Sequence, residues 1–256
     1  MSGALKVLSH HLRLYRRVWK GSVFVSFVSP VLYLASIGVG LGSLVSRGPA
    51  HAIGGVSYAA FIAPGLLAAT AMMTASSETT FPIMARVYWM RTYDAMLASP
   101  LTVRDLVGGE LLWLCFRLAL VSVIFFVVMA AFHTVHSVQA LFAIPVAILS
   151  GLAFGLPVMA WSAKQRTDTP FALLFRFVVT PLFVLGGTFF PIDRLPRLLE
   201  DIAWLTPLAH GVALTRALTT GQAALSSALG HVTVLAIYAA IGIAAALVTF
   251  RQELAR

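Results

Sequence analysis

Long apolar runs, separated by charged or turn-forming residues, occupy most of this chain. Six of the runs are close to the roughly 20 residues that a helix needs to cross the hydrocarbon core of a bilayer. They cover residues 23–45, 57–80, 106–132, 138–161, 171–190 and 231–250. The pattern predicts an all-α integral membrane protein with six membrane helices, in a single domain over residues 1–256.

A basic amphipathic segment precedes the first run. Between residues 1 and 21, Leu5, Leu8 and Leu12 recur at intervals of three and four, and cations recur in the same way on another face. The cations include Arg13, Arg17 and Lys20. This pattern is typical of a helix that lies in the membrane interface with its cations toward lipid headgroups. The alternative is a cleaved signal peptide, but the apolar core of such a peptide has about 7–15 residues. We therefore expect an interfacial helix at residues 1–21 and an uncleaved membrane helix after it.

Residues 86–105 lie between the second and third runs and are rich in charge. Apolar side chains recur there at helical spacing: Trp89, Met90, Tyr93, Met96 and Leu97. Pro100 ends this short helix, because the residue before a proline is driven out of the α region. Thr102 with Asp105 predicts a capping box that begins the third membrane helix. A short amphipathic helix so tightly joined to a membrane helix is suited to transmit the motion of a partner protein at the membrane surface. An ordinary solvated loop helix fits the composition equally well.

Residues 191–221 fit neither a loop nor a crossing. An apolar stripe that includes Leu195, Leu198 and Ile202 lies opposite charged residues, and Pro207 then breaks the helix. Each piece is too short to span a membrane. We expect two re-entrant half-helices that dip from the outer face, because irregular backbone at membrane depth must be covered by protein. An extracellular amphipathic hairpin is the alternative.

Composition and charge support this assignment. The chain is 59% hydrophobic and 11% charged, whereas soluble domains carry about a quarter charged residues. The net charge is +9, but the basic residues flank apolar runs instead of forming one patch, which excludes a nucleic-acid partner. Thirteen of the 18 lysines and arginines lie near the termini, in 86–104 or in 164–176. The positive-inside rule therefore places both termini and residues 86–110 in the cytoplasm.

The sequence contains no catalytic or nucleotide-binding motif. It has no glycine-rich phosphate loop, and none of its lysines (Lys6, Lys20, Lys164) follows a glycine. His133 and His136 are three residues apart, but no Cys, Asp or Glu lies near them, so we expect no metal site. His210, in the segment 191–221, is interpreted as a hydrogen-bonding structural residue.

Ionisable residues inside the apolar runs carry more information. Glu78 lies near the inner end of the second run, and Glu110 and Arg117 lie seven residues apart in the third, on one helical face. Such residues are costly in a membrane and usually face a cavity or a partner. They either line a pathway near the cytoplasmic side or anchor helix ends at the interface, and the sequence leaves both interpretations open.

Several stretches, in order along nearly the whole chain, resemble the ABC-2 family of export permeases, and most closely its NodJ type, the lipooligosaccharide export permeases. They are residues 30–42, 58–65, 78–79, 91–97, 109–110, 180–191 and 205–210. Pro82, four residues after Glu78, departs from the family pattern at the inner end of the second helix.

The resemblance implies the membrane subunit of an ABC exporter in the inner membrane, with no catalytic residue and no cofactor of its own. A separate ATPase, which binds ATP and Mg²⁺, would dock on residues 86–105 and on the N-terminal helix. A second copy or a paralogue would complete the pathway for an amphiphilic or hydrophobic substrate such as a lipooligosaccharide, a glycolipid or a drug. The residues implied in ATPase coupling are Arg91, Tyr93, Asp94, Met96, Leu97 and Arg104, and those implied in the pathway or gate are Glu78, Glu110, Arg117, Phe189, Phe190 and His210.

Two other classes are less consistent with the sequence. An ion-coupled secondary transporter is the main alternative, but the two halves show no convincing repeat and acidic residues at mid-membrane are few. A membrane-embedded enzyme would need a cluster of His, Asp or Glu, and these residues do not gather.

Overall fold

A computed structural model of the chain describes residues 2–36 and 57–254, and every regular element in these residues is helical. The long helices are α1 (Gly3–Ala35), α3 (Tyr58–Thr79), α6 (Val103–Ala131), α7 (Ala143–Ser162) and α12 (Leu225–Leu254). The short helices are α4 (Phe81–Met84), α5 (Thr92–Leu97), α8 (Thr169–Leu174), α9 (Thr180–Leu185), α10 (Arg197–Trp204) and α11 (Pro207–Thr220). The π-helical turns η2 (Ala85–Trp89) and η4 (Phe175–Val179) and the 3₁₀ turns η3 (Val138–Phe142) and η5 (Ile192–Arg194) complete the set.

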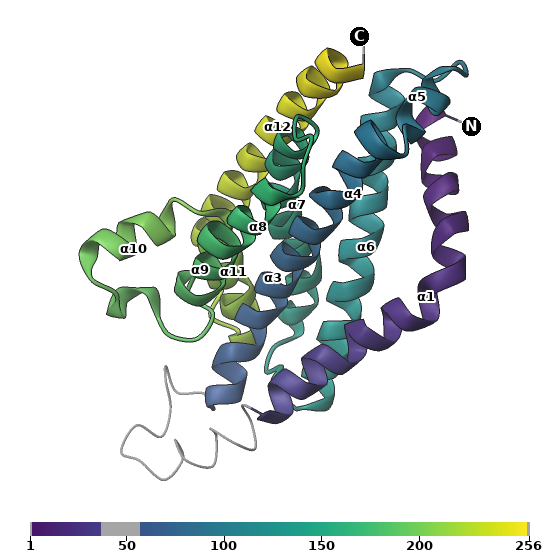
Figure 1. The fold of residues 1–256 in the computed structure, drawn as a ribbon. Coiled ribbons are helices and arrows are strands. Elements are labelled where there is room, and N and C mark those ends of the chain that lie inside the picture. The colour runs from purple at the N-terminus through teal and green to yellow at the C-terminus, as the bar shows by residue number, and fades with distance from the viewer. Residues whose placement is uncertain (1, 37–56, 255–256) are drawn as a thin grey trace.

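The long helices run side by side as a bundle (Figure 1). Five of the described helices are long and apolar enough to cross a membrane, so the expected all-α, multi-pass architecture is confirmed. Both ends of the described chain lie at one end of the bundle, next to α5 (Figure 1). We call this the terminal end, and the opposite end the far end.

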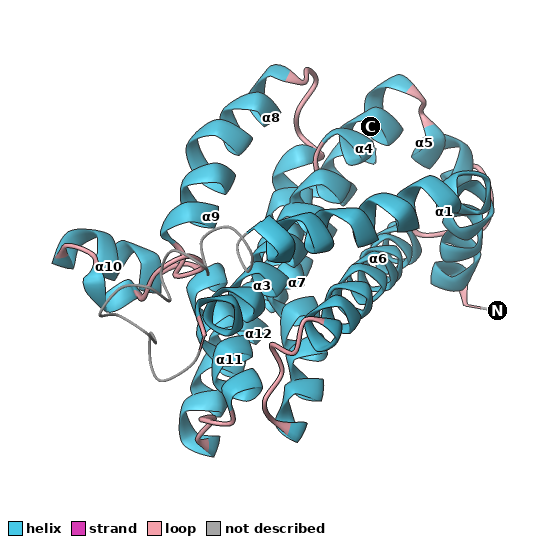
Figure 2. Ribbon diagram, turned by 90° about the horizontal axis from the view of Figure 1, so that it is seen from below, coloured by secondary structure: helices cyan, strands magenta, loops and turns pink. Residues whose placement is uncertain are grey.

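Helix α3 lies at the centre of the bundle and α1 at its edge. α3 packs against α6, α7 and α11, and α7 also packs along α12, whereas α1 packs along α6 (Figure 2). The buried residues of α1 are Val7, His11, Pro30 and Leu34. Phe24, with 68% of its surface exposed, points away from the bundle. The outer side of α1 is therefore available to lipid or to another protein.

Glycine allows close approach at two helix contacts. A Cβ on Gly109 of α6 would overlap the side chain of Val7 in α1. A Cβ on Gly242 of α12 would lie 2.6 Å from the Cβ of Leu156 in α7. Small residues of this kind are the usual means by which membrane helices pack, because apolar side chains gain little by leaving lipid for one another.

The helix boundaries differ from the predicted ones in three places. α1 runs without a break through residue 22, where we expected an interfacial helix to end, and residues 37–45 of the first predicted crossing lie outside the described chain. The second crossing is interrupted at Thr80 but restarts with Pro82 in the first turn of α4 and continues to Trp89. Proline suits that position because the first turn of a helix leaves its N–H groups unpaired.

The third difference concerns the fifth predicted crossing, residues 171–190. It is a shorter apolar run, Thr169–Leu185, in which α8 and α9 are joined by the π-helical turn η4. Gly186 and Gly187 follow it, and Gly187 has a φ of 82°, a conformation that favours glycine. The number of crossings, six, stays a prediction.

The two helices of the predicted re-entrant segment have different surroundings. α11 packs against α3 and α7, and its Arg216 donates hydrogen bonds to the carbonyl oxygens of Phe61 (3.0 Å) and Gly187 (2.7 Å). The same guanidinium lies 3.8 Å from the centre of the Phe61 ring. α10, by contrast, projects from the bundle (Figure 1); Leu198 in α10 and Leu205 directly after it are exposed.

The contact at Gly109 predicts a stability effect. Gly109→Leu should lower the free energy of unfolding by about 1–3 kcal/mol, because α1 must move away from α6 to make room. Gly230→Ala in α12 is the control, since no atom lies within 4 Å of the added Cβ, and it should leave stability unchanged or slightly higher. Melting temperatures of the purified variants in one detergent measure both effects. Equal melting temperatures for Gly109→Leu and the wild type would contradict the packing argument.

Candidate functional site

The corner between α5 and α6 shapes the terminal end of the bundle. Thr102 caps α6 as expected, because its Oγ1 accepts from the Asp105 backbone N–H and the Asp105 carboxylate accepts from the Thr102 N–H at 2.9 Å. The short helix predicted around residues 89–98 is divided. Arg91 has a left-handed backbone (φ 47°), so Trp89 belongs to η2, and α5 begins at Thr92.

A buried carboxylate connects four elements at this corner. Glu110 of α6 is 2% exposed and receives hydrogen bonds from three directions. Its Oε1 accepts from Tyr93 Oη in α5 (2.7 Å) and from His11 Nε2 in α1 (2.9 Å), and its Oε2 accepts from Arg86 Nη1 in η2 (2.9 Å). An ionised carboxylate only accepts hydrogen bonds, so each partner must donate. α1, η2, α5 and α6 are therefore held in one arrangement by a single side chain.

Tyr93 holds α5 against two helices, because its hydroxyl bonds to Glu110 in α6 and its ring contacts Phe250 in α12. The side chain is fully buried, and its ring centre lies 5.6 Å from that of Phe250 in α12. Burial, together with the negative charge of Glu110, raises the pKa of the Tyr93 phenol well above its usual value. The phenol therefore keeps its proton and remains a donor to Glu110 at any physiological pH.

A second polar cluster lies farther along α6. Arg117 Nε donates to Glu78 Oε1 at 2.7 Å, and Arg117 Nη1 donates to Ser22 Oγ in α1 at 2.7 Å. Trp113 Nε1 donates to the other oxygen of Glu78 at 3.1 Å. Glu110 and Arg117, which the sequence places on one helical face, thus bond to different partners. Together the two clusters connect α1 to α6 at two levels, and the second cluster also connects both helices to α3.

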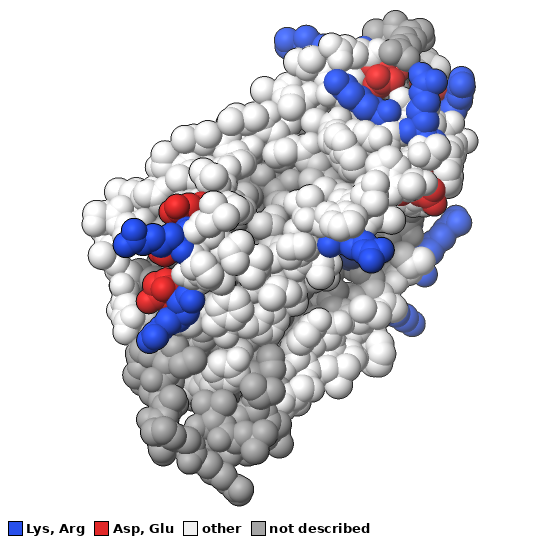
Figure 3. Space-filling view, turned by 60° about the vertical axis from the view of Figure 1, so that its left-hand side comes forward, with Lys and Arg blue, Asp and Glu red and all other residues white. Residues whose placement is uncertain are grey.

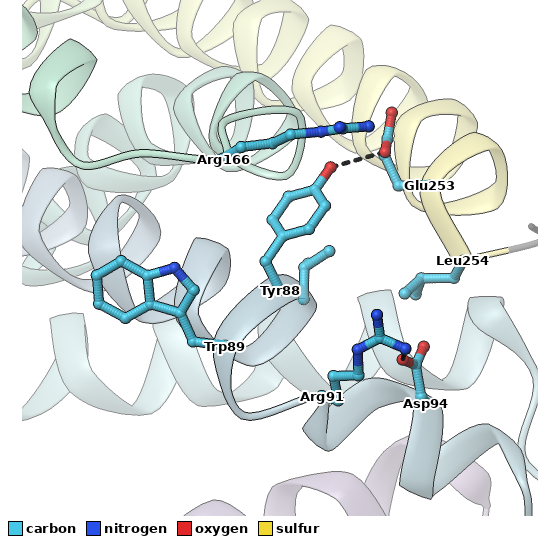
Figure 4. A pocket seen from close by; sticks show the side chains of 8 residues that line it. Tyr88, Trp89, Arg91, Asp94, Arg166, Glu253 and Leu254 are labelled. Atoms are coloured by element: carbon cyan, nitrogen blue, oxygen red, sulfur yellow. Dashed lines mark hydrogen bonds and ion pairs between the residues drawn. The ribbon is translucent and has the colours of Figure 1, made fainter.

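The terminal end also holds a polar cavity of about 390 Å³ (Figure 4). It is lined by Val87, Tyr88, Trp89, Arg91, Asp94, Arg166, Glu253 and Leu254. Tyr88 Oη donates to Glu253 Oε2 at 2.7 Å, which joins η2 to the end of α12. Arg166, from the connection between α7 and α8, places its guanidinium 5.8 Å from the Tyr88 ring. Three segments far apart in the sequence therefore meet in one surface hollow beside α5.

The remaining residues singled out in the sequence fall into three groups. Exposed at the surface are Arg13, Arg17, Lys20, Arg91, Asp94 and Arg104. Partly buried against the main core are Met96, Leu97 and Phe189. The third group is Phe190, which is half-buried, and His210 in the first turn of α11, which contacts His231 (Nδ1 to Nδ1, 2.9 Å) and the Trp204 carbonyl (2.9 Å). Figure 3 shows several basic side chains at the terminal end, a mixed group of charges around α10, and a further basic group near the middle of this face, all set in a broad uncharged surface.

Sequence reasoning did not identify the partners of Glu110. The sequence pattern predicts an apolar stripe through Leu5, Leu8 and Leu12, which does not include His11, yet Leu5 is 42% exposed whereas Val7 and His11 are buried. The spacing of four between positions 7, 11 and 15 marks the packed face in retrospect. The sequence indicates for Arg86 only a role in membrane orientation.

Loss of the Glu110 carboxylate should cost much stability. Glu110→Ala leaves Arg86, only 15% exposed, and His11 without their acceptor, and uncompensated buried charge costs about 3–5 kcal/mol. Asp94→Ala is the matched control in the same region. Its carboxylate lies 3.9 Å from Arg91 and both side chains are exposed, so its removal should cost at most about 1 kcal/mol. Thermal melting of the two purified variants tests the difference, and similar melting points would show that Glu110 does not hold the corner together.

Comparison with known proteins agrees with this architecture. The sequence model of the family described as ABC-2 type transporter matches residues 6–220. Nodulation protein J of Rhizobium leguminosarum bv. viciae is 34% identical over 252 residues, which cover 96% of this chain and 95% of that protein. Nodulation protein J of Rhizobium meliloti (strain 1021) is 32% identical over 227 residues, which cover 89% of this chain and 84% of that protein.

A more distant relative is the inner membrane transport permease YadH of Escherichia coli (strain K12). It is 22% identical over 211 residues, which cover 82% of this chain and 80% of that protein. The family model covers well over half of the chain, and the nodulation proteins match it almost from end to end. The chain therefore belongs to the ABC-2 type transporter family, as a non-catalytic membrane permease subunit of an exporter.

Proposed function

We propose that this permease takes its energy from a separate ATPase subunit through α5, and that Tyr93 and Glu110 pass the motion of α5 to the membrane helices. The observation that carries the proposal is the buried bond between Tyr93 Oη and Glu110 Oε1, 2.7 Å long. A helix six residues long has little stability of its own. Because its buried tyrosine is bonded to α6 and packed on α12, α5 transmits force instead of yielding to it.

The docking surface of the ATPase is the exposed side of this corner. Trp89 is 56% exposed and Met90 62% exposed; Arg91 and Asp94 line the same surface hollow as Trp89, and Arg104 is exposed in the first turn of α6. Exposed aromatic and methionine side chains with nearby arginine are typical of protein interfaces. The basic residues Arg13, Arg17 and Lys20 of α1 extend the surface toward the headgroups of the inner leaflet. The terminal end then faces the cytoplasm, and both termini lie inside the cell.

Nucleotide binding would drive the cycle by favouring one of two permease conformations. ATP and Mg²⁺ are held by the ATPase, and closure of two ATPase subunits would displace α5. Glu110 also holds α1 through His11 and η2 through Arg86, so these elements would move together. The ATPase shifts the equilibrium only as far as it binds one conformation better than the other.

The far end would form the outer gate. In this proposal the chain crosses the inner membrane six times, with Thr169–Leu185 as the fifth crossing and α10 and α11 as a re-entrant pair. Phe189, Phe190 and His210 are the proposed gate residues, and Arg216 anchors α11 to the start of α3 and to Gly187. That anchor supports the proposal because it fixes α11 relative to the helix that begins at Tyr58.

The cargo is proposed to be amphiphilic or hydrophobic, such as a lipooligosaccharide, another glycolipid or a drug. A second copy of the chain, or a paralogue, would complete the pathway. The exposed apolar side of α1, with Phe24, Val25 and Leu32, offers a surface for that second permease. Membrane lipid would cover the remaining exposed apolar surface.

The docking surface can be tested without disturbing the core. Trp89→Ala with Met90→Ala should weaken binding of the ATPase by tenfold or more, because buried aromatic anchors at interfaces are worth about 2 kcal/mol or more each. Expression and melting temperature should be retained, since both side chains are exposed. Leu198→Ala, 73% exposed on α10, is the control and should bind the ATPase like the wild type. Co-purification of the ATPase and its permease-dependent ATP hydrolysis are the measurements, and unchanged coupling in the double variant would remove this surface from the mechanism.

Orientation in the membrane is open to a second test. A green fluorescent protein fused after residue 256 should fluoresce and an alkaline phosphatase there should be inactive, because the positive-inside rule places this end in the cytoplasm. A phosphatase inserted after Gly221, at the far end, should be active. The reverse result would place α5 outside the cell and exclude coupling to a cytoplasmic ATPase.

A further inference from the structure

Helix α10 stands away from the bundle, and its end is bonded to two other helices (Figure 1). His210 in α11 donates a hydrogen bond from Nε2 to the carbonyl oxygen of Trp204, the last residue of α10, at 2.9 Å. Tyr238 in α12 donates from its hydroxyl to the carbonyl oxygen of Leu205, the next residue. His231 in α12 contacts His210, Nδ1 to Nδ1, at 2.9 Å. A pair of imidazoles therefore joins α12 to the corner where α10 meets α11.

The hydrogen bonds determine which ring nitrogens of the pair carry protons. A carbonyl oxygen only accepts, so His210 Nε2 must be protonated. The Nδ1 atom of neutral His210 is then an acceptor, because a neutral imidazole has only one N–H. His231 Nδ1 must therefore donate the bond between the two rings. Of the two rings, His231 Nε2 then holds the lone pair that can take up a proton without breaking either bond.

One added proton preserves this arrangement. On His231 Nε2 it makes that ring a cationic donor, and hydrogen bonds from charged donors are about twice as strong as neutral ones. The Trp204 ring lies nearly parallel to the His231 ring, at 18° with 6.0 Å between ring centres, where an aromatic face attracts a cation. If the charge lies on His210 instead, His210 Nδ1 donates and His231 Nδ1 accepts. The bond between the rings survives in either case.

A second added proton is incompatible with the bond between the rings. Both Nδ1 atoms would then carry a hydrogen, and two cationic rings would face each other across 2.9 Å with no lone pair between them. The separated rings can bind two added protons, whereas the joined rings bind only one. Acid therefore favours separation, by up to about tenfold per pH unit. Both imidazoles are partly exposed, so protons can reach them.

The carboxylates on the surrounding elements do not neutralise the pair. Within residues 2–36 and 57–254, neither imidazole forms an ion pair with Asp193, Glu200 or Asp201. The charged or titratable groups on these elements are Asp193 and Arg194 of η5, Arg197, Glu200 and Asp201 of α10, Arg216 of α11, and Tyr238 of α12, with Arg251 and Glu253 at the other end of α12. The charge of the two rings therefore decides whether they stay together.

We propose that His210 and His231 form a proton-sensitive latch, which holds α12 to the corner of α10 and α11 while the pair has taken up at most one proton and opens when both rings are charged. α11 and α12 both pack on α7, so α10 is the element that moves when the latch opens. The relevance of the latch to export rests on the proposed function, in which His210 belongs to the outer gate and acid outside the cell would loosen that gate. The latch itself requires neither the ATPase nor cargo.

Distances between spin labels test the latch in the purified permease without the ATPase. In a Cys115→Ser background, which removes the one native thiol, nitroxides are attached to Leu198→Cys in α10 and Ile241→Cys in α12, positions that are 73% and 60% exposed. Their distance distribution should broaden as the pH falls from about 8 to about 5, a range in which histidine changes charge and most carboxylates do not. It should narrow again when the pH is restored. Labels at Val127→Cys in α6 and Ile241→Cys should not respond, which controls for general loosening of the bundle.

Substitutions separate the imidazole pair from other effects of acid. His231→Gln should keep the distribution narrow throughout this pH range, because its amide can turn either its N–H or its carbonyl oxygen toward His210. His210→Gln, the reciprocal change, should behave in the same way. Tyr238→Phe removes the other bond between α12 and the end of α10, but no imidazole, so the response to acid should persist.

Two results would overturn the latch. One is a native distribution that does not change with pH, and the other is equal broadening in both glutamine variants. Acid broadening that does not reverse would indicate denaturation and would also count against it. These measurements use neither the ATPase nor cargo, so a failure of the latch is distinguishable from a failure of the proposed function.

Discussion

The carboxylate of Glu110 determines how the terminal end of this permease is assembled. Burying a charge is unfavourable unless every lone pair finds a donor, and here a cation, an imidazole and a phenol supply the donors from three other elements. All three contacts form together only when α1, η2, α5 and α6 sit in one relative arrangement. The electrostatic requirement of one side chain thus fixes the geometry of the corner where a partner would bind.

Other acidic residues also join helices, although the chain has only nine Asp and Glu residues. Glu78 joins α3 to α6 through Arg117 and Trp113, and Glu253 joins the end of α12 to η2 through Tyr88. Apolar side chains alone cannot specify which membrane helices pair, because lipid tails satisfy them equally well. Close glycine contacts such as that of Gly109 with Val7, and a few buried polar bonds, therefore carry the specificity of the bundle.

The sequence predicted those features that depend on local chemistry. The apolar runs located α6, α7 and α12 to within several residues, and the Thr102–Asp105 capping box was read directly from the residues. The local pattern of residues did not predict the left-handed backbone of Arg91 or the unbroken course of α1. The partners of Glu110 could not be predicted because they depend on tertiary contacts: His11 is 99 residues away in sequence, and only the folded bundle brings it to the carboxylate.

The three donors around Glu110 also have an evolutionary consequence. A neutral side chain at position 110 would leave both Arg86 and His11 without their acceptor, so a substitution at position 110 alone is harmful. It is harmful even where a changed set of residues at all of these positions would be stable. Positions 11, 86, 93 and 110 should therefore drift as a set across descendants, through intermediates that keep the charges balanced. The sequence of the buried corner would then diverge slowly. The exposed surface beside it can change more quickly, together with the surface of the protein that binds it.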